Sequence, residues 1–339
     1  MWLRICRLTL FFFILGLLTV SSLSSAQEPA KVYRIGWLGP YYSISLLAFL
    51  NQLRALGWVE GQNFVMVYRT APGVLFQDRA AELAAELIQG NVDIIVAIGG
   101  PAALAAKEAT TTIPIVMAGI NFPVERGLIT SLAHPGGNVT GLTSSLDEGF
   151  EAKELSLLKE AVPGLSRVAV LLNPLTPGKT PRPDEHERMV KVWQTAAERL
   201  GITALVAIVT EAREYKATFA RFTQENADAM YVASEYLNNA AARHIMKFAH
   251  AQGLPVMTDN IDILRAGALL YYWADWRDIR RRSAIYVDKI LRGAKPSELP
   301  VERPDTFELI INLQTANALD LTIPPTLLLQ ATEVINATP

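Results

Sequence analysis

The sequence has almost no cysteine, since Cys6 is the single one among 339 residues. A disulfide framework is therefore excluded, and the stability of the fold has to come from buried apolar side chains. Histidine is scarce as well, with four residues, and no second histidine stands at metal-ligand spacing from His186. We expect neither a metal site nor a cofactor.

An excess of charge of one sign is also missing. Lys and Arg total 31 and Asp and Glu total 33, which leaves a formal net charge of −2. This balance excludes a strongly basic nucleic-acid-binding protein and an acidic disordered chain alike. The sequence contains no Gly-x-Ser-x-Gly motif, and nothing singles out a catalytic pair of carboxylates, so we expect no enzyme. A two-lobed enzyme such as a sugar transferase stays an alternative, which needs an acid or base with a perturbed pKa between the lobes.

Only one hydrophobic run is long, and it stands at the N-terminus. Two arginines precede an apolar stretch at residues 8–20, and the small residues before Gln27 form a cleavage site. The run is shorter than the ~20 residues of a membrane-spanning helix, so a cleavable export signal over residues 1–26 is favoured over an uncleaved anchor. The single cysteine lies before the run, which argues against a lipid anchor. We therefore expect a periplasmic protein.

The rest of the sequence alternates short apolar runs with amphipathic segments in two successive series. Continuous apolar strands separated by helices are typical of parallel sheets that helices cover on both faces. The predicted fold class is therefore α/β, with two doubly wound parallel-sheet lobes. The predicted strands lie at 34–39, 63–69, 92–98 and 113–120 in the first series and at 167–172, 202–209, 229–233, 254–258, 268–273 and 307–312 after it.

Hydrogen-bonding and aromatic residues directly follow several of these strands. Parallel sheets bind ligands at the carboxyl ends of their strands, so two facing lobes predict a site in the cleft between them. Such side chains suit a small polar ligand with an apolar part, and the glycines before Pro101 open a helix whose N–H groups suit a carboxylate. The candidate ligand-binding residues are Tyr41, Ser43, Gly100 and Asn121 on the first wall and Asn173, Glu235, Tyr236 and Asp259 on the second.

Nine segments of the sequence carry a family resemblance. They are residues 53–63 (LRALGWVEGQN), 81–87, 92–96, 101–107, 111–116, 132–141 (LAHPGGNVTG), 157–163, 286–296 and 307–312. On these segments, in this order, the sequence resembles the periplasmic substrate-binding proteins of ABC transporters, in the family that includes tryptophan- and tyrosine-binding members. The likeness covers nearly all of residues 31–335.

The resemblance implies a type I periplasmic binding fold, in which the chain crosses between the lobes three times. We expect these crossings near Thr140, Gly267 and Val301. The resulting division assigns residues 1–26 to the signal peptide, 31–140 and 268–300 to lobe 1, and 141–267 and 301–335 to lobe 2.

The resemblance also implies a function. Such a protein is the periplasmic solute-binding component of an ABC import system, which binds a small molecule and delivers it to an inner-membrane permease and its ATPase. We expect an amino acid or a related small carboxylate as the ligand, and a monomer that contacts no nucleic acid. A sensor module that reports its ligand to a membrane receptor is the alternative, because the sequence does not separate the two roles.

One segment departs from the family pattern. Members often have an Asp-Pro pair after the fourth strand, where this sequence has Asn121-Phe122-Pro123. If that acid meets a ligand ammonium group, its absence weakens the case for an amino acid. The glycines around Gly99 are kept, so a carboxylate on the ligand remains an expectation.

Overall fold

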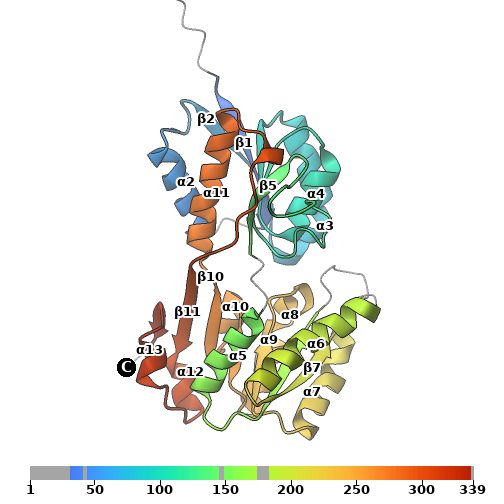
Figure 1. The fold of residues 1–339 in the computed structure, drawn as a ribbon, viewed down its shortest axis with the longest axis vertical. Helices are drawn as coiled ribbons and strands as arrows, with labels where there is room; N and C mark the ends of the chain where they lie inside the picture. Colours follow the sequence, from blue (N-terminus) through green and yellow to red (C-terminus); the bar gives the residue numbers. More distant parts are fainter. Residues whose placement is uncertain (1–30, 41–43, 145–148, 174–182, 337–339) are drawn as a thin grey trace, which may run out of the picture.

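Two lobes lie one above the other along the longest axis of the protein (Figure 1). The structure is a computed structural model, and it describes residues 31–40, 44–144, 149–173 and 183–336. Within these ranges, no helix is long and apolar enough to cross a membrane. The predicted export signal lies outside the described residues, and so do Tyr41 and Ser43.

The first lobe is built on a five-stranded parallel sheet with the strand order β2-β1-β3-β4-β5. Helix α11 lies beside α2 and β4 in this lobe, although it comes from a distant part of the sequence (Figure 1). The elements of the lobe are β1 (Tyr33–Pro40), α2 (Ile44–Ala55), β2 (Phe64–Ala71), α3 (Gly73–Gln89), β3 (Ile94–Ala97), α4 (Gly100–Ala109), β4 (Ile115–Ile120), β5 (Val139–Thr143), α11 (Trp276–Leu291) and the 3-10 turn η2 (Pro296–Glu298).

The second lobe contains a seven-stranded sheet with the order β12-β11-β10-β9-β8-β6-β7. Its pairs are parallel except β10 with β11, which run antiparallel. The strands are β6 (Arg167–Leu172), β7 (Thr203–Ile208), β8 (Ala229–Val232), β9 (Val256–Thr258), β10 (Leu270–Ala274), β11 (Phe307–Asn312) and β12 (Glu333–Ile335). The helices are α5 (Phe150–Ala161), α6 (Pro183–Arg199), α7 (Tyr215–Gln224), α8 (Tyr236–Ala240), α9 (Ala242–Ala251), α10 (Ile261–Arg265), α12 (Leu313–Ala318) and α13 (Pro325–Leu328), with the 3-10 turn η1 (Ala212–Glu214) before α7.

Both sheets are buried on both faces, as the continuous apolar runs predict. Successive side chains of a strand point to opposite faces, so neighbours in sequence enter different core layers. Trp37 and Leu38 of β1 do so in the first lobe, and Val170 and Leu171 of β6 do so in the second. The α/β class and the two-lobed, doubly wound architecture are therefore confirmed.

The three crossings between the lobes all lie later in the chain than predicted. Strand β10 pairs with β9 and β11 in the second sheet, so assigning its residues to lobe 1 was wrong. The chain passes to the first lobe only between Ala274 and Trp276. Strand β5 stays in the first sheet up to Thr143, and the Glu302 amide still donates to the Gly141 carbonyl oxygen of that strand. The apolar pattern of a single strand does not reveal which sheet it joins, because only its hydrogen-bonding partners decide that.

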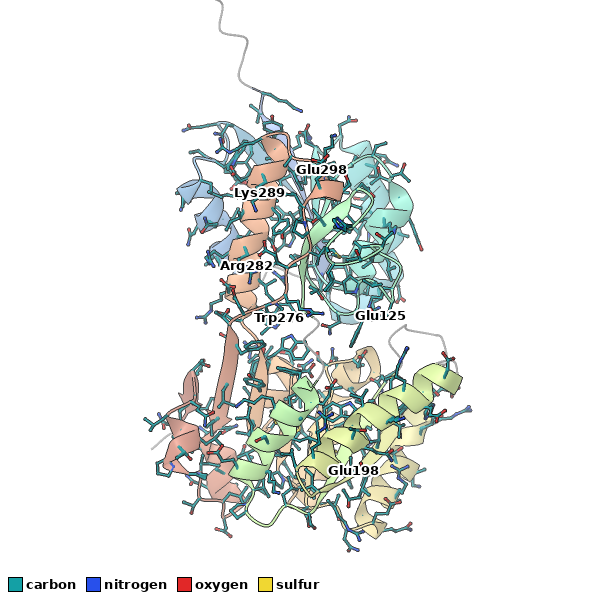
Figure 2. The ribbon with its side chains drawn as sticks, viewed as in Figure 1. Glu125, Glu198, Trp276, Arg282, Lys289 and Glu298 are labelled. Atoms are coloured by element: carbon teal, nitrogen blue, oxygen red, sulfur yellow. The ribbon has the colours of Figure 1, made fainter. Side chains whose placement is uncertain are left out.

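The second and third crossings are tied together. The Asp275 amide donates a 3.0 Å hydrogen bond to the carbonyl oxygen of Thr306. The Asp275 side chain also caps α11, since its carboxylate accepts hydrogen bonds from the amides of the first turn. Figure 2 shows Trp276, at the start of α11, at the level where the two lobes meet, with Arg282 further along the same helix.

Candidate functional site

The loop after β4 forms the edge of the first lobe that faces the second, and Figure 2 shows Glu125 at this position. Phe122, in this loop, has a φ of +53°, and about 37% of the residue is exposed. The left-handed region costs an ordinary L-residue roughly 1 kcal/mol or more, so local contacts have to hold the loop in shape. The Arg126 amide supplies one of them by donating to the Phe122 carbonyl oxygen at 3.0 Å.

The Arg126 side chain joins two of the predicted site residues. Its Nε donates a 2.9 Å hydrogen bond to the carbonyl oxygen of Asn121, whose Oδ1 accepts from the Ser144 hydroxyl at 2.7 Å. Its guanidinium lies against Gly100 at the start of α4, where a Cβ would stand 3.2 Å from Nη1. Gly100 and Asn121 thus lie together as predicted, and any side chain at position 100 would press on the guanidinium.

Arg126 itself is a residue that the sequence analysis missed. The signal that could have found it is its place in the loop that directly follows the predicted fourth strand. Burial lowers the pKa of Arg126, while the charge of Glu235, on the second lobe, opposes that shift. Arg126 is therefore a half-buried positive charge on the first lobe that interacts electrostatically with Glu235 on the second.

The second lobe presents carboxyl groups at the carboxyl ends of its strands. Glu235 stands at the N-terminus of α8, after β8, and Asp259 directly follows β9. Figure 1 places α8 and α10 at the edge of this lobe that faces the first. Burial raises the pKa of Glu235 to about 8 and that of Asp259 to about 7. The Asp259 carboxylate accepts a hydrogen bond from the Ser234 amide, which holds it at the end of the sheet.

A third carboxyl group lies deeper beneath them. Glu154 of α5 is 1% exposed, and its Oε1 accepts a 2.8 Å hydrogen bond from the Tyr231 hydroxyl. Burial, with a contribution from the charge of Asp259, raises the pKa of Glu154 well above its usual range. Among the described residues, Arg126 is the only basic group that lowers the pKa of any of the three carboxyls. The edge of the second lobe therefore favours a cation.

Aromatic rings border this acidic edge near the crossings. Phe150 at the start of α5 stacks on Tyr272 of β10, with 5.3 Å between the ring centroids and 13° between the planes. Phe307 of β11 completes the cluster at 5.7 Å from Tyr272. Burial raises the pKa of Tyr272, and the charge of Glu154 adds to that rise. The second lobe therefore combines an acidic edge with an aromatic surface.

Asn173 lies at the end of β6 as predicted, but its side chain is occupied by the scaffold. Its Nδ2 donates to the carbonyl oxygens of Leu172 and Val209, and its Oδ1 accepts from the Asn238 amide at 2.8 Å. Asn238 is itself fully buried and accepts from the Tyr215 hydroxyl at 2.9 Å. The Asn173 side chain thus stabilises the ends of β6 and β7. Of Tyr236, the structure describes only the backbone, as the first residue of α8.

Residues 46–335 match the family model described as ABC transporter substrate binding protein. The chain belongs to this family. It is 26% identical over 283 residues to a tyrosine-binding protein of Clostridioides difficile (strain R20291), a match that covers 80% of this chain and 75% of the relative. The family is one of solute-binding proteins, and the predicted resemblance is confirmed.

Solved structures agree with this assignment. A conserved domain protein from Vibrio cholerae is similar, with a TM-score of 0.75 and 27% identity over 90% of this chain and all of the other. A protein from Streptococcus pneumonia in complex with L-Trp has a TM-score of 0.76 at 24% identity, with the same coverage. A leucine-binding protein from Thermotoga maritima has a TM-score of 0.51 at 16% identity and covers 79% of this chain and 78% of its own. These likenesses confirm the type I periplasmic binding fold.

The carboxyl groups of the second lobe do not make a metal centre. Within the described parts of the chain, no group of three or more His, Cys, Asp or Glu side chains is arranged to hold a metal ion. The carboxylate oxygens of the acidic edge accept hydrogen bonds of the kind that an ammonium group donates.

Proposed function

We propose that this protein captures an aromatic amino acid between its two lobes in the periplasm and delivers it to an inner-membrane ABC permease and its ATPase. Membership of the substrate-binding family supports the transport role. The tyrosine-binding relative, with 26% identity over 80% of this chain, supports the ligand class.

The observation that carries the ligand class is the acidic edge of the second lobe beside an aromatic cluster. Glu235 and Asp259 follow their strands where sheets of this kind bind ligands. Their pKa values are raised because burial disfavours their charged forms, and a bound ammonium group would supply the missing positive charge. Phe150 and Tyr272, on the same lobe, offer a ring surface, as a ligand with an aromatic side chain requires.

Capture follows from the way the lobes are joined. Three crossings allow the lobes to swing toward one another as rigid bodies. A ligand that contacts both lobes stabilises the closed form, because it makes its full set of contacts only there. The closed, loaded form is the one that the permease would recognise.

Native mass spectrometry of the protein purified from the periplasm tests this function. We expect a protein mass that begins at Gln27, together with a bound small molecule that mild denaturation releases. Isothermal titration calorimetry then compares tyrosine and tryptophan with alanine, which lacks a ring, and with benzoate, which lacks an ammonium group. Tighter binding of the two aromatic amino acids supports the proposal. Preference for alanine or benzoate, or the absence of binding to tyrosine and tryptophan, contradicts it.

A further inference from the structure

We propose that Arg126 binds the carboxylate of the ligand and that Glu235, on the opposite lobe, binds its ammonium group. This assignment rests on the proposed function and deepens it, because it gives each lobe one end of the amino acid. It adds Arg126 as a residue that determines specificity for a free carboxylate.

One N–H group of the Arg126 guanidinium holds the side chain in place, and the other N–H groups remain available to a ligand. Its Nε is fixed by the 2.9 Å hydrogen bond to the Asn121 carbonyl oxygen. Its Nη1 and Nη2 donate no hydrogen bond to any residue that the structure describes. Two parallel N–H groups of a guanidinium match the two oxygens of a carboxylate. The missing side chain at Gly100 leaves room for the guanidinium to lie flat against the start of α4.

Glu235 stands at the N-terminus of α8, at the edge of the second lobe that faces the first (Figure 1). Burial raises the pKa of Glu235 to about 8, and the charge of Arg126 opposes that rise. These two described side chains nevertheless form no direct hydrogen bond or ion pair with each other. A zwitterion placed between them would pair its carboxylate with Arg126 and its ammonium group with Glu235. Each lobe would then hold one charge of the ligand, and closure would bring the two pairs together.

The loop after β4 carries one acid, Glu125, and one base, Arg126, next to each other. The Arg126 guanidinium lies against Gly100, where it attracts a carboxylate and repels an ammonium group. The ammonium group consequently has to be recognised by the carboxyls of the second lobe, where Glu235 and Asp259 stand.

Three ligands that differ in their charged groups test the assignment by titration calorimetry. They are tyrosine, tyramine (no carboxylate) and 3-(4-hydroxyphenyl)propanoate (no ammonium group). Arg126→Gln is expected to weaken tyrosine binding by roughly 10- to 100-fold and to leave tyramine binding unchanged, because a charge-assisted hydrogen bond is lost. Glu235→Gln is expected to weaken tyrosine binding while it leaves binding of the propanoate unchanged.

The matched control is Arg79→Gln, which removes an exposed arginine of the same lobe that pairs with Glu82 on α3. It should bind all three ligands as the unmodified protein does. Equal loss of tyrosine and tyramine in Arg126→Gln, or no loss of tyrosine, overturns the assignment while the proposed function stands. If the unmodified protein binds neither tyrosine nor tryptophan and takes the propanoate only with Arg126 intact, the proposed function fails and the carboxylate contact stands. Absence of binding to every probe overturns both.

Discussion

At the scale of single residues, backbone positions without a side chain decide how closely the strands of the first lobe approach. Gly141 of β5 has a φ of +124°, and a Cβ there would stand 2.3 Å from the Met117 carbonyl oxygen and 2.7 Å from its nitrogen. Both atoms belong to the backbone of β4, which cannot rotate away as a side chain would. The same residue accepts the hydrogen bond of the Glu302 amide, so it also fixes the third crossing.

Gly141→Ala is therefore expected to lower the free energy of unfolding by about 2–4 kcal/mol, since the strained φ and the overpacking act together. Urea unfolding followed by circular dichroism measures this difference. Gly137→Ala is the matched control, because a Cβ there meets nothing within 4 Å and the position lies in the same region of the chain. Its effect should stay within about 0.5 kcal/mol. Equal stability of the two variants would show that β4 and β5 can separate without cost.

At the scale of elements, an ionic cluster attaches the third crossing to α11. The Arg282 side chain is 13% exposed and pairs with Glu302 and, at 3.1 Å, with Asp305. It also lies 3.6 Å from Oδ2 of Asp278, a buried oxygen without a hydrogen-bond partner among the described residues. The guanidinium thus compensates a carboxylate on its own helix while it holds the segment that leads to β11.

Arg282→Gln is expected to destabilise the protein by about 2 kcal/mol, between the values for exposed and for buried ion pairs. Amide hydrogen exchange should become faster in residues 301–306, because the crossing loses its attachment to α11. Arg281→Gln is the control, since Arg281 pairs with Asp278 from a side chain that is 48% exposed. It should leave the exchange of that segment unchanged. Unchanged exchange in Arg282→Gln would mean that the backbone hydrogen bonds alone hold the crossing.

The elements also show how much of the fold and of the site can be predicted from the sequence. Apolar runs and amphipathic spacing predict nearly every strand, because burial on both faces leaves a strong pattern. The lobe that β10 joins depends on its pairing with β11, whose paired residues are 33 to 41 positions away in sequence (Ala274 with Phe307, Leu270 with Ile311) and leave no local trace. The same limit applies to the predicted site. Gly100 and Asn121 could be predicted because they lie after strand ends, whereas Arg126 lies in the middle of a loop and was missed. Asn173 was predicted from its strand-end position, but its side chain is held by the protein itself. The position alone does not reveal that the side-chain amide of Asn173 hydrogen-bonds to Val209 and Asn238.

At the scale of the whole molecule, the buried carboxyls link stability to pH. Burial raises the pKa of Asp259 from 3.8 to about 7, because the folded protein favours its neutral form. This contribution to stability is fully present below about pH 4 and is lost as the pH rises through about 7. Glu235, with a pKa raised to about 8, acts in the same direction. A ligand ammonium group has the opposite effect, since it favours the ionised carboxylates.

The ligand-free protein is therefore expected to lose stability between pH 5 and pH 8, whereas the stabilisation by tyrosine should grow over the same range. Thermal unfolding at both pH values, with and without tyrosine, measures the two trends. Asp259→Asn keeps an oxygen for the Ser234 amide but cannot ionise, so at pH 8 it should make the ligand-free protein more stable by about 1–3 kcal/mol. Asp262→Asn, an exposed acid of α10 that pairs with Arg265, should leave both trends in place. A ligand-free stability that rises toward pH 8 would show that these carboxyls are already ionised and compensated in the folded protein. In that case the second lobe would carry no uncompensated negative charge that an ammonium group could neutralise.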